Sequence, residues 1–173
     1  MTDDDRRADL PPGTEPGVLA DRLKERIYAT ITMIAVAVGL SFSDVGSLGA
    51  IATVLTTALG LWLAAFVADQ QAHRTVHRHF ATGQELRRML YVSSPLLSCA
   101  AGPAVLIALA ALDVLTLNTA LMVAAGVGVV SLFLWGCLGG LRMGGGVLAA
   151  VVAGLVDAAI GVAVALVKAS AGH

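Results

Sequence analysis

Charged residues are scarce in this chain of 173 residues, where Asp, Glu, Lys and Arg together make up 13%. A water-soluble domain carries about 25% charged residues, which it uses to cover its surface. The same chain is 57% hydrophobic. The scarcity of charge excludes an ordinary water-soluble domain and predicts an integral membrane protein. The net charge of −1 also argues against a nucleic-acid partner.

Catalytic motifs are absent as well. The sequence has no P-loop, no HExxH and no Ser–His–Asp pattern with supporting context. We therefore expect neither an enzyme nor a cofactor. The chain has only 2 cysteines, Cys99 and Cys137, and both lie in apolar runs. We interpret them as small buried hydrophobic residues, with a disulfide or a metal role as the alternative.

The N-terminal segment lacks the apolar core of a signal peptide. It contains Pro11, Pro12 and Pro16 together with many acids, and the first apolar run begins only at Ile27. This composition predicts a disordered cytoplasmic tail over residues 1–21.

Long apolar runs fill the rest of the chain. A spanning helix needs about 20 mostly apolar residues. The runs are residues 27–42, 48–68, 93–112, 117–138 and 147–167. They predict an all-α bundle of about five transmembrane helices, which forms a single domain over residues 22–170.

Basic residues predict the orientation of these spans. Lys and Arg collect on the cytoplasmic side of a membrane. The N-terminal flank and the connections 69–92 and 139–146 contain them, whereas the connections 43–47 and 113–116 contain none. The pattern predicts a multi-pass protein of the cell membrane with a cytoplasmic N-terminus and an extracytoplasmic C-terminus. Lys168 alone departs from it.

The connection 69–92 is the only long one, and we expect a cytoplasmic amphipathic helix between the second and third spans. Ala72, Val76 and Phe80 recur every four residues and are surrounded by His and Arg. His73 and His77 would share one helix face and could hold a metal. The alternative is a basic surface that faces anionic lipid. Thr82 with Glu85 has the form of a capping box and predicts that a new helix begins there.

Asp157 lies about halfway along the last span. A carboxylate at the centre of a bilayer costs on the order of 2.5–3.5 kcal/mol, so it needs a polar surrounding or a proton. The functional interpretation is an ion or proton site. The alternative is a neutral, hydrogen-bonded acid that holds helices together.

Polar and helix-breaking residues occur at a similar depth in the other spans. Pro103 lacks an N–H, so the carbonyl of Cys99 would lose its helical partner. Interrupted helices near the midplane often bind the cargo of transporters. The candidates for a transport path are Asp157, Thr53, Thr56, Thr57, Cys99, Pro103 and Ser131. The alternative is that threonines and glycines here are packing residues.

Small residues recur at helical spacing in the last two spans. Gly136, Gly140 and Gly144 are four residues apart, and Gly154, Ala158 and Gly161 give the last span a small-residue face. This spacing predicts close helix–helix packing. It fits a homo-oligomer such as a dimer, and packing within one chain explains it equally well.

The number of spans and the long basic connection resemble the vacuolar iron transporter family. The likeness is best in Leu132–Gly136, the glycine-rich turn and Ile160–Val162, while Glu25–Thr30 is closer to small bacterial five-helix membrane proteins. The resemblance implies a five-helix fold. That family has an Asn-Asp-Gly motif in its first helix, and residues 27–42 contain no acid, so no functional residue is carried over.

Two functional hypotheses follow. The first is a small transporter or channel-like protein for a cation or proton, with a site around Asp157. The second is a membrane scaffold or accessory subunit that transports nothing and acts through helix–helix contacts. In either case the lipid bilayer is the main partner.

Overall fold

The computed structural model describes residues 16–171, and within that range the chain is helical with no strand. The helices are α2 (Pro16–Ser41), α3 (Ser47–His77), α4 (Gly83–Ser98), α5 (Ala101–Ala111), α6 (Leu117–Arg142) and α7 (Gly146–Ala171). The predicted all-α fold class is confirmed for the described residues.

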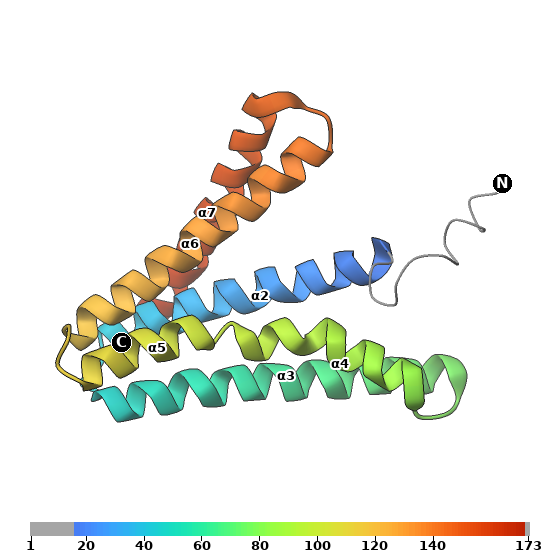
Figure 1. Ribbon diagram of the computed structural model, residues 1–173, viewed down its shortest axis with the longest axis horizontal. Helices are drawn as coiled ribbons and strands as arrows, with labels where there is room; N and C mark the ends of the chain where they lie inside the picture. Colours follow the sequence, from blue (N-terminus) through green and yellow to red (C-terminus); the bar gives the residue numbers. More distant parts are fainter. Residues whose placement is uncertain (1–15, 172–173) are drawn as a thin grey trace.

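The helices form two groups that are linked by α2 (Figure 1). In the first group, α3 packs against α4 and α5. In the second, α6 and α7 form a hairpin that leans away from the first group. α2 packs against α4 on one side and against α6 and α7 on the other, so it connects the two groups.

The core lies where the two groups meet and consists largely of small side chains. Alanine allows two helix axes to come close together, as membrane helices require. The buried core residues are Met33, Ile34, Ala37, Ala50, Val54, Ala58, Ala100, Ile107, Leu121, Ala124, Ala125, Leu132 and Ala165.

Four helical stretches are long and apolar enough to cross a membrane: Ser47–His77, Gly83–Ala111, Leu117–Arg142 and Gly146–Val167. At most 28% of the most apolar window in each of them is buried inside the protein. Apolar side chains that face outward in this number are consistent with contact with a lipid bilayer. These helices fit an integral, multi-pass membrane protein.

α2 contains all but the last residue of the predicted first span, residues 27–42, but it is not one of these four. Charged residues occupy its first half, which leaves about 15 apolar residues, or about 22 Å of helix. The hydrocarbon core of a bilayer is roughly 30 Å thick. The fifth span therefore stays a prediction.

Two predicted boundaries differ from the structure. Residues 16–21 of the predicted tail belong to α2, where Pro16 takes the first helical position and Val18 is buried. Residues 1–15 of that tail lie outside the described residues. In the connection where we expect an amphipathic helix, residues 69–77 continue α3, because no Gly or Pro interrupts residues 61–77, and the amphipathic helix itself stays a prediction.

Two glycines of α6, Gly136 and Gly140, allow α7 of the same chain to pack closely against it. A Cβ on Gly140 would lie 2.5 Å from the Cα of Ala150, and a Cβ on Gly136 would lie 2.7 Å from the Cα of Gly154. α6 and α7 therefore pack almost backbone to backbone. Packing within one chain accounts for this glycine spacing, and the homo-oligomer stays a prediction.

Candidate functional site

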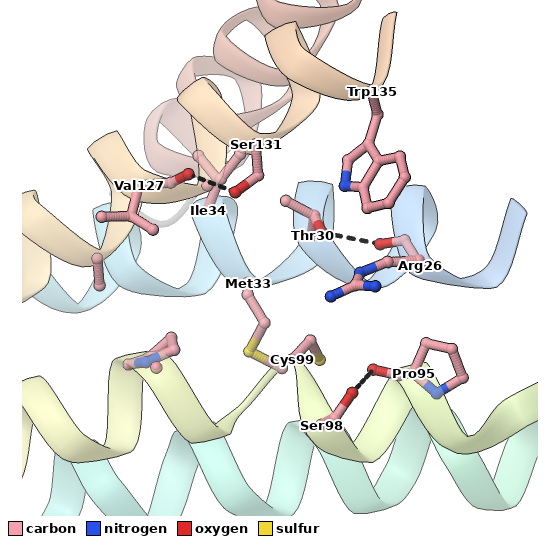
Figure 2. Close-up of a pocket in the computed structure, with 14 residues that line it drawn as sticks. Arg26, Thr30, Met33, Ile34, Pro95, Ser98, Cys99, Val127, Ser131 and Trp135 are labelled. Carbon is pink, nitrogen blue, oxygen red and sulfur yellow. Dashed lines mark hydrogen bonds between the residues drawn. The ribbon is translucent and has the colours of Figure 1, made fainter. Parts of the chain in front are cut away.

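A cavity of about 260 Å³ lies where α2 and α6 pass the junction between α4 and α5 (Figure 2). It is large enough for several water molecules or a small solute. The residues that line it are Arg26, Thr30, Met33, Ile34, Pro95, Ser98, Cys99, Gly102, Pro103, Ala124, Val127, Gly128, Ser131 and Trp135.

The wall formed by α4 and α5 is an interrupted helix. α4 ends at Ser98 and α5 begins at Ala101, so the break falls on Cys99 and Ala100. Pro103, in the first turn of α5, cannot donate to the carbonyl of Cys99. The predicted loss of a helical partner for Cys99 thus falls at the cavity itself, because both residues line it.

Three hydroxyl groups line the cavity from three different helices. Thr30, Ser98 and Ser131 each donate their hydrogen to a carbonyl of their own helix, at 2.8, 3.2 and 2.8 Å. A hydroxyl that has donated its hydrogen still has lone pairs with which to accept. The cavity therefore offers polar contacts between apolar walls.

Arg26 supplies the only charged side chain among the residues that line the cavity. Its guanidinium carbon lies 5.1 Å from the centroid of the Trp135 ring. Neither Asp nor Glu lies in the lining. A single positive charge in the lining favours an anion or a hydrogen-bond acceptor over a cation.

Asp157 lies outside the cavity, in the interface between α6 and α7. A Cβ on Gly136 would lie 2.6 Å from the Oδ2 of Asp157, so the carboxylate rests against the backbone of α6. The side chain is partly buried, and among the described residues no hydrogen bond or ion pair reaches it. The structure does not bring Asp157 together with the predicted path residues of the cavity.

Thr53, Thr56 and Thr57 belong to α3 and do not line the cavity. Thr53 and Thr56 are exposed and donate to carbonyls of their own helix at 2.9 and 2.7 Å. Equal depth in the membrane does not imply contact. Of the predicted path residues, the structure brings together Cys99, Pro103 and Ser131.

The predicted histidine pair lies at the C-terminal end of α3. The ring centroids of His73 and His77 are 4.4 Å apart. Two further residues join them across the turn: His79, whose ring lies 5.1 Å from that of His73, and Glu85, whose Oε2 lies 3.2 Å from the Nε2 of His73.

Sequence reasoning missed Arg26, Thr30, Ser98 and Trp135. The candidates were chosen for an acid or for a position near the midplane of the membrane, and Arg26 is a base at the start of an apolar run. One signal was present, because Arg26, Thr30 and Ile34 are four residues apart and share one face of a helix.

No family model, curated protein or solved structure matches this chain. The resemblance to the vacuolar iron transporter family therefore rests on the sequence patterns alone.

Proposed function

We propose that this protein is a small transporter or channel-like membrane protein, and that the cavity between α2, α6 and the α4–α5 junction holds its solute. One observation carries the proposal: a polar cavity with a single guanidinium lies beside an interrupted helix. Transporters often bind their cargo at such interruptions. The charge of Arg26 favours a small anion or a neutral hydrogen-bond acceptor, in contrast to the cation expected from Asp157.

We also propose that α2 crosses the membrane, with its charged first half in the cytoplasmic headgroup region. In Figure 1 the N-terminal end of α2, the α3–α4 turn and the α6–α7 turn lie toward one side, and the other two turns toward the opposite side. The basic residues in the part of the chain that the structure describes concentrate at the first set of ends. This arrangement supports five spans with a cytoplasmic N-terminus.

Thiol labelling tests whether water reaches the cavity. Cys99 lines the cavity, whereas Cys137 lies near Gly154 at the packed α6–α7 interface. We expect Cys137→Ser, which keeps Cys99, to react with a small membrane-impermeant thiosulfonate added from one side only. Cys99→Ser, which keeps Cys137, is the matched control and should react far more slowly. Equal rates for the two variants would contradict a wet cavity.

Flux into reconstituted vesicles tests the solute class. We expect a panel of small anions and neutral polar solutes to include at least one whose uptake requires Arg26. Arg26→Gln should reduce that uptake by about tenfold or more, as the loss of a charge-assisted hydrogen bond predicts. Arg22→Gln is the matched control, because Arg22 lies one turn earlier on α2 and stacks on Tyr91 at 4.1 Å, outside the cavity. An equal fall in both variants would argue against a specific role for Arg26.

A proton or cation path at Asp157 is the second candidate. The observation that favours it is a partly buried carboxylate, without a hydrogen-bond partner among the described residues, against the backbone of α6. Asp157→Asn should then abolish proton or cation flux while the protein still folds. Flux that does not change would remove Asp157 from the path.

If neither kind of flux nor labelling of Cys99 occurs, the scaffold or accessory-subunit hypothesis is favoured.

A further inference from the structure

The turn between α3 and α4 gathers three of the 4 histidines of the chain within a few residues. His73 and His77 lie on the last turns of α3, His79 lies in the connection, and Glu85 lies in the first turn of α4. None of these four residues lines the cavity.

The backbone of this turn is held in place by specific contacts. Arg78 ends α3 in the left-handed conformation, with φ of 63°, and its N–H donates to the carbonyl of Arg74 at 2.9 Å. The side chain of Gln70 bonds both backbone groups of Ala81, at 3.1 and 3.4 Å. The chain therefore reverses at a defined place, which brings His79 and Glu85 back over His73.

His73 has an unusual environment for a ring nitrogen. Its side chain is only 8% exposed, and its Nε2 is buried without a hydrogen-bond partner among residues 16–171. The Oε2 of Glu85 lies 3.2 Å from this nitrogen, but the pair does not have the geometry of a hydrogen bond. A buried polar atom without a partner is costly and calls for a physical explanation.

Glu85 also departs from its expected role. The capping-box pattern predicts that Thr82 and Glu85 cap α4, yet Thr82 makes no side-chain cap bond, and the Glu85 carboxylate lies near the imidazole of His73. The carboxylate is thus placed beside the unpartnered nitrogen.

We propose that His73, His79 and Glu85 form a binding site for a divalent transition metal of the zinc class. One ligand atom from each of the three lies within 4.8 Å of the others. In a tetrahedral zinc site with bonds of about 2.1 Å, neighbouring ligand atoms lie about 3.4 Å apart. Because His79 and Glu85 are exposed, their side chains have room to rotate, and a bound metal would draw their ligand atoms closer to that of His73.

The donor set also selects the metal. Two imidazoles and one carboxylate suit zinc, nickel or copper, whereas magnesium and calcium prefer oxygen ligands alone. Three protein ligands leave a fourth position for water. Because the ligands come from α3, from the turn and from α4, a bound metal would cross-link α3 and α4.

The experiment measures zinc binding to the full-length protein in detergent, prepared without a polyhistidine tag. Isothermal titration gives the stoichiometry and the affinity, and the visible spectrum of the cobalt-substituted protein reports the coordination geometry. His79→Gln and Glu85→Gln remove exposed ligands, so they should leave the fold intact. His77→Gln is the matched control, because His77 belongs to the same cluster but not to the proposed ligand set.

We expect one zinc ion per chain, and a tetrahedral cobalt spectrum that His79→Gln and Glu85→Gln abolish. Each of these two variants should bind zinc about 100-fold more weakly, since even the loss of a residue that only supports a ligand costs 10- to 100-fold. His77→Gln should bind like the wild type. The absence of zinc binding would overturn the proposal and leave only a close contact between His73 and Glu85. Weaker binding in His77→Gln alone would overturn it in favour of a His73–His77 pair on α3.

Discussion

The guanidinium of Arg26 lies over the indole ring of Trp135, with 5.1 Å between the guanidinium carbon and the ring centroid. This contact joins α2 to α6 at the edge of the cavity that both residues line (Figure 2). Cation–π contacts contribute about 0.5–2 kcal/mol, depending on how far water is excluded. The indole therefore helps to hold the one charge of the cavity lining in place.

Replacing Trp135 should change the position of the Arg26 guanidinium more than it changes the stability of the fold. We expect Trp135→Leu to reduce uptake of the transported solute several-fold while the Tm of the detergent-solubilised protein changes little, because Leu keeps much of the apolar contact. Vesicle uptake and thermal unfolding measure the two effects. Trp62→Leu is the control, since Trp62 stacks on Phe66 within α3 at 6.0 Å, away from the cavity. An equal loss of uptake in both variants would contradict this role for Trp135.

A methyl group on Gly136 should separate α6 from α7. The added Cβ would meet the Gly154 Cα at 2.7 Å and the Ala153 carbonyl oxygen at 2.9 Å, and backbone atoms cannot move aside cheaply. We expect Gly136→Ala to lower the free energy of unfolding by about 1–3 kcal/mol, as overpacking does. Gly139→Ala, on the same helix, meets nothing within 4 Å and should be neutral or slightly stabilising. Equal stability of both variants in denaturant titrations would refute the close packing.

Restoring an N–H at position 103 should make the α4–α5 stretch more continuous. We expect Pro103→Ala to slow thiol labelling of Cys99 several-fold in the Cys137→Ser background, because the alanine N–H can donate to the Cys99 carbonyl. Pro95→Ala is the control variant, in which we do not expect labelling of Cys99 to slow. Pro95 also lacks an N–H, but the Ser94 hydroxyl already donates to the Tyr91 carbonyl that Pro95 cannot reach, at 2.8 Å. Labelling that stays unchanged in Pro103→Ala would show that Pro103 does not keep the cavity open.

The two hydrogen bonds from Gln70 should stabilise the α3–α4 turn. We expect Gln70→Ala to leave the buried backbone of Ala81 without these partners and to cost about 1–3 kcal/mol locally. Faster hydrogen exchange over residues 78–82 would report this loss. Gln71→Ala removes only an exposed contact with Arg74 and should exchange like the wild type. If the metal site is correct, Gln70→Ala should also weaken zinc binding.

Much of the fold could be predicted from residue types alone. Lipid offers no hydrogen bonds to the backbone, and a helix makes all of these bonds within one segment. Apolar runs of about 20 residues are therefore expected to form helices that span the bilayer. That argument predicts the membrane class and the approximate positions of α3, α6 and α7. The missing N–H of Pro103 separately predicts that the carbonyl of Cys99 loses its helical partner. A helix was also predicted in the connection 69–92, and α3 continues to His77 because no Gly or Pro interrupts residues 61–77.

The candidate site required the tertiary structure. Depth along each span could be estimated from the sequence, so Asp157, Thr56 and Cys99 appeared to share one layer. Which face each helix turns toward its neighbours depends on packing. Because α7 packs against the glycines of α6, Asp157 lies in the α6–α7 interface and not in the cavity. Likewise, the spacing of His73 and His77 follows from helix geometry alone. The addition of His79 and Glu85 depends on a chain reversal at Arg78, a residue type that rarely adopts a positive φ, so only the folded chain reveals it.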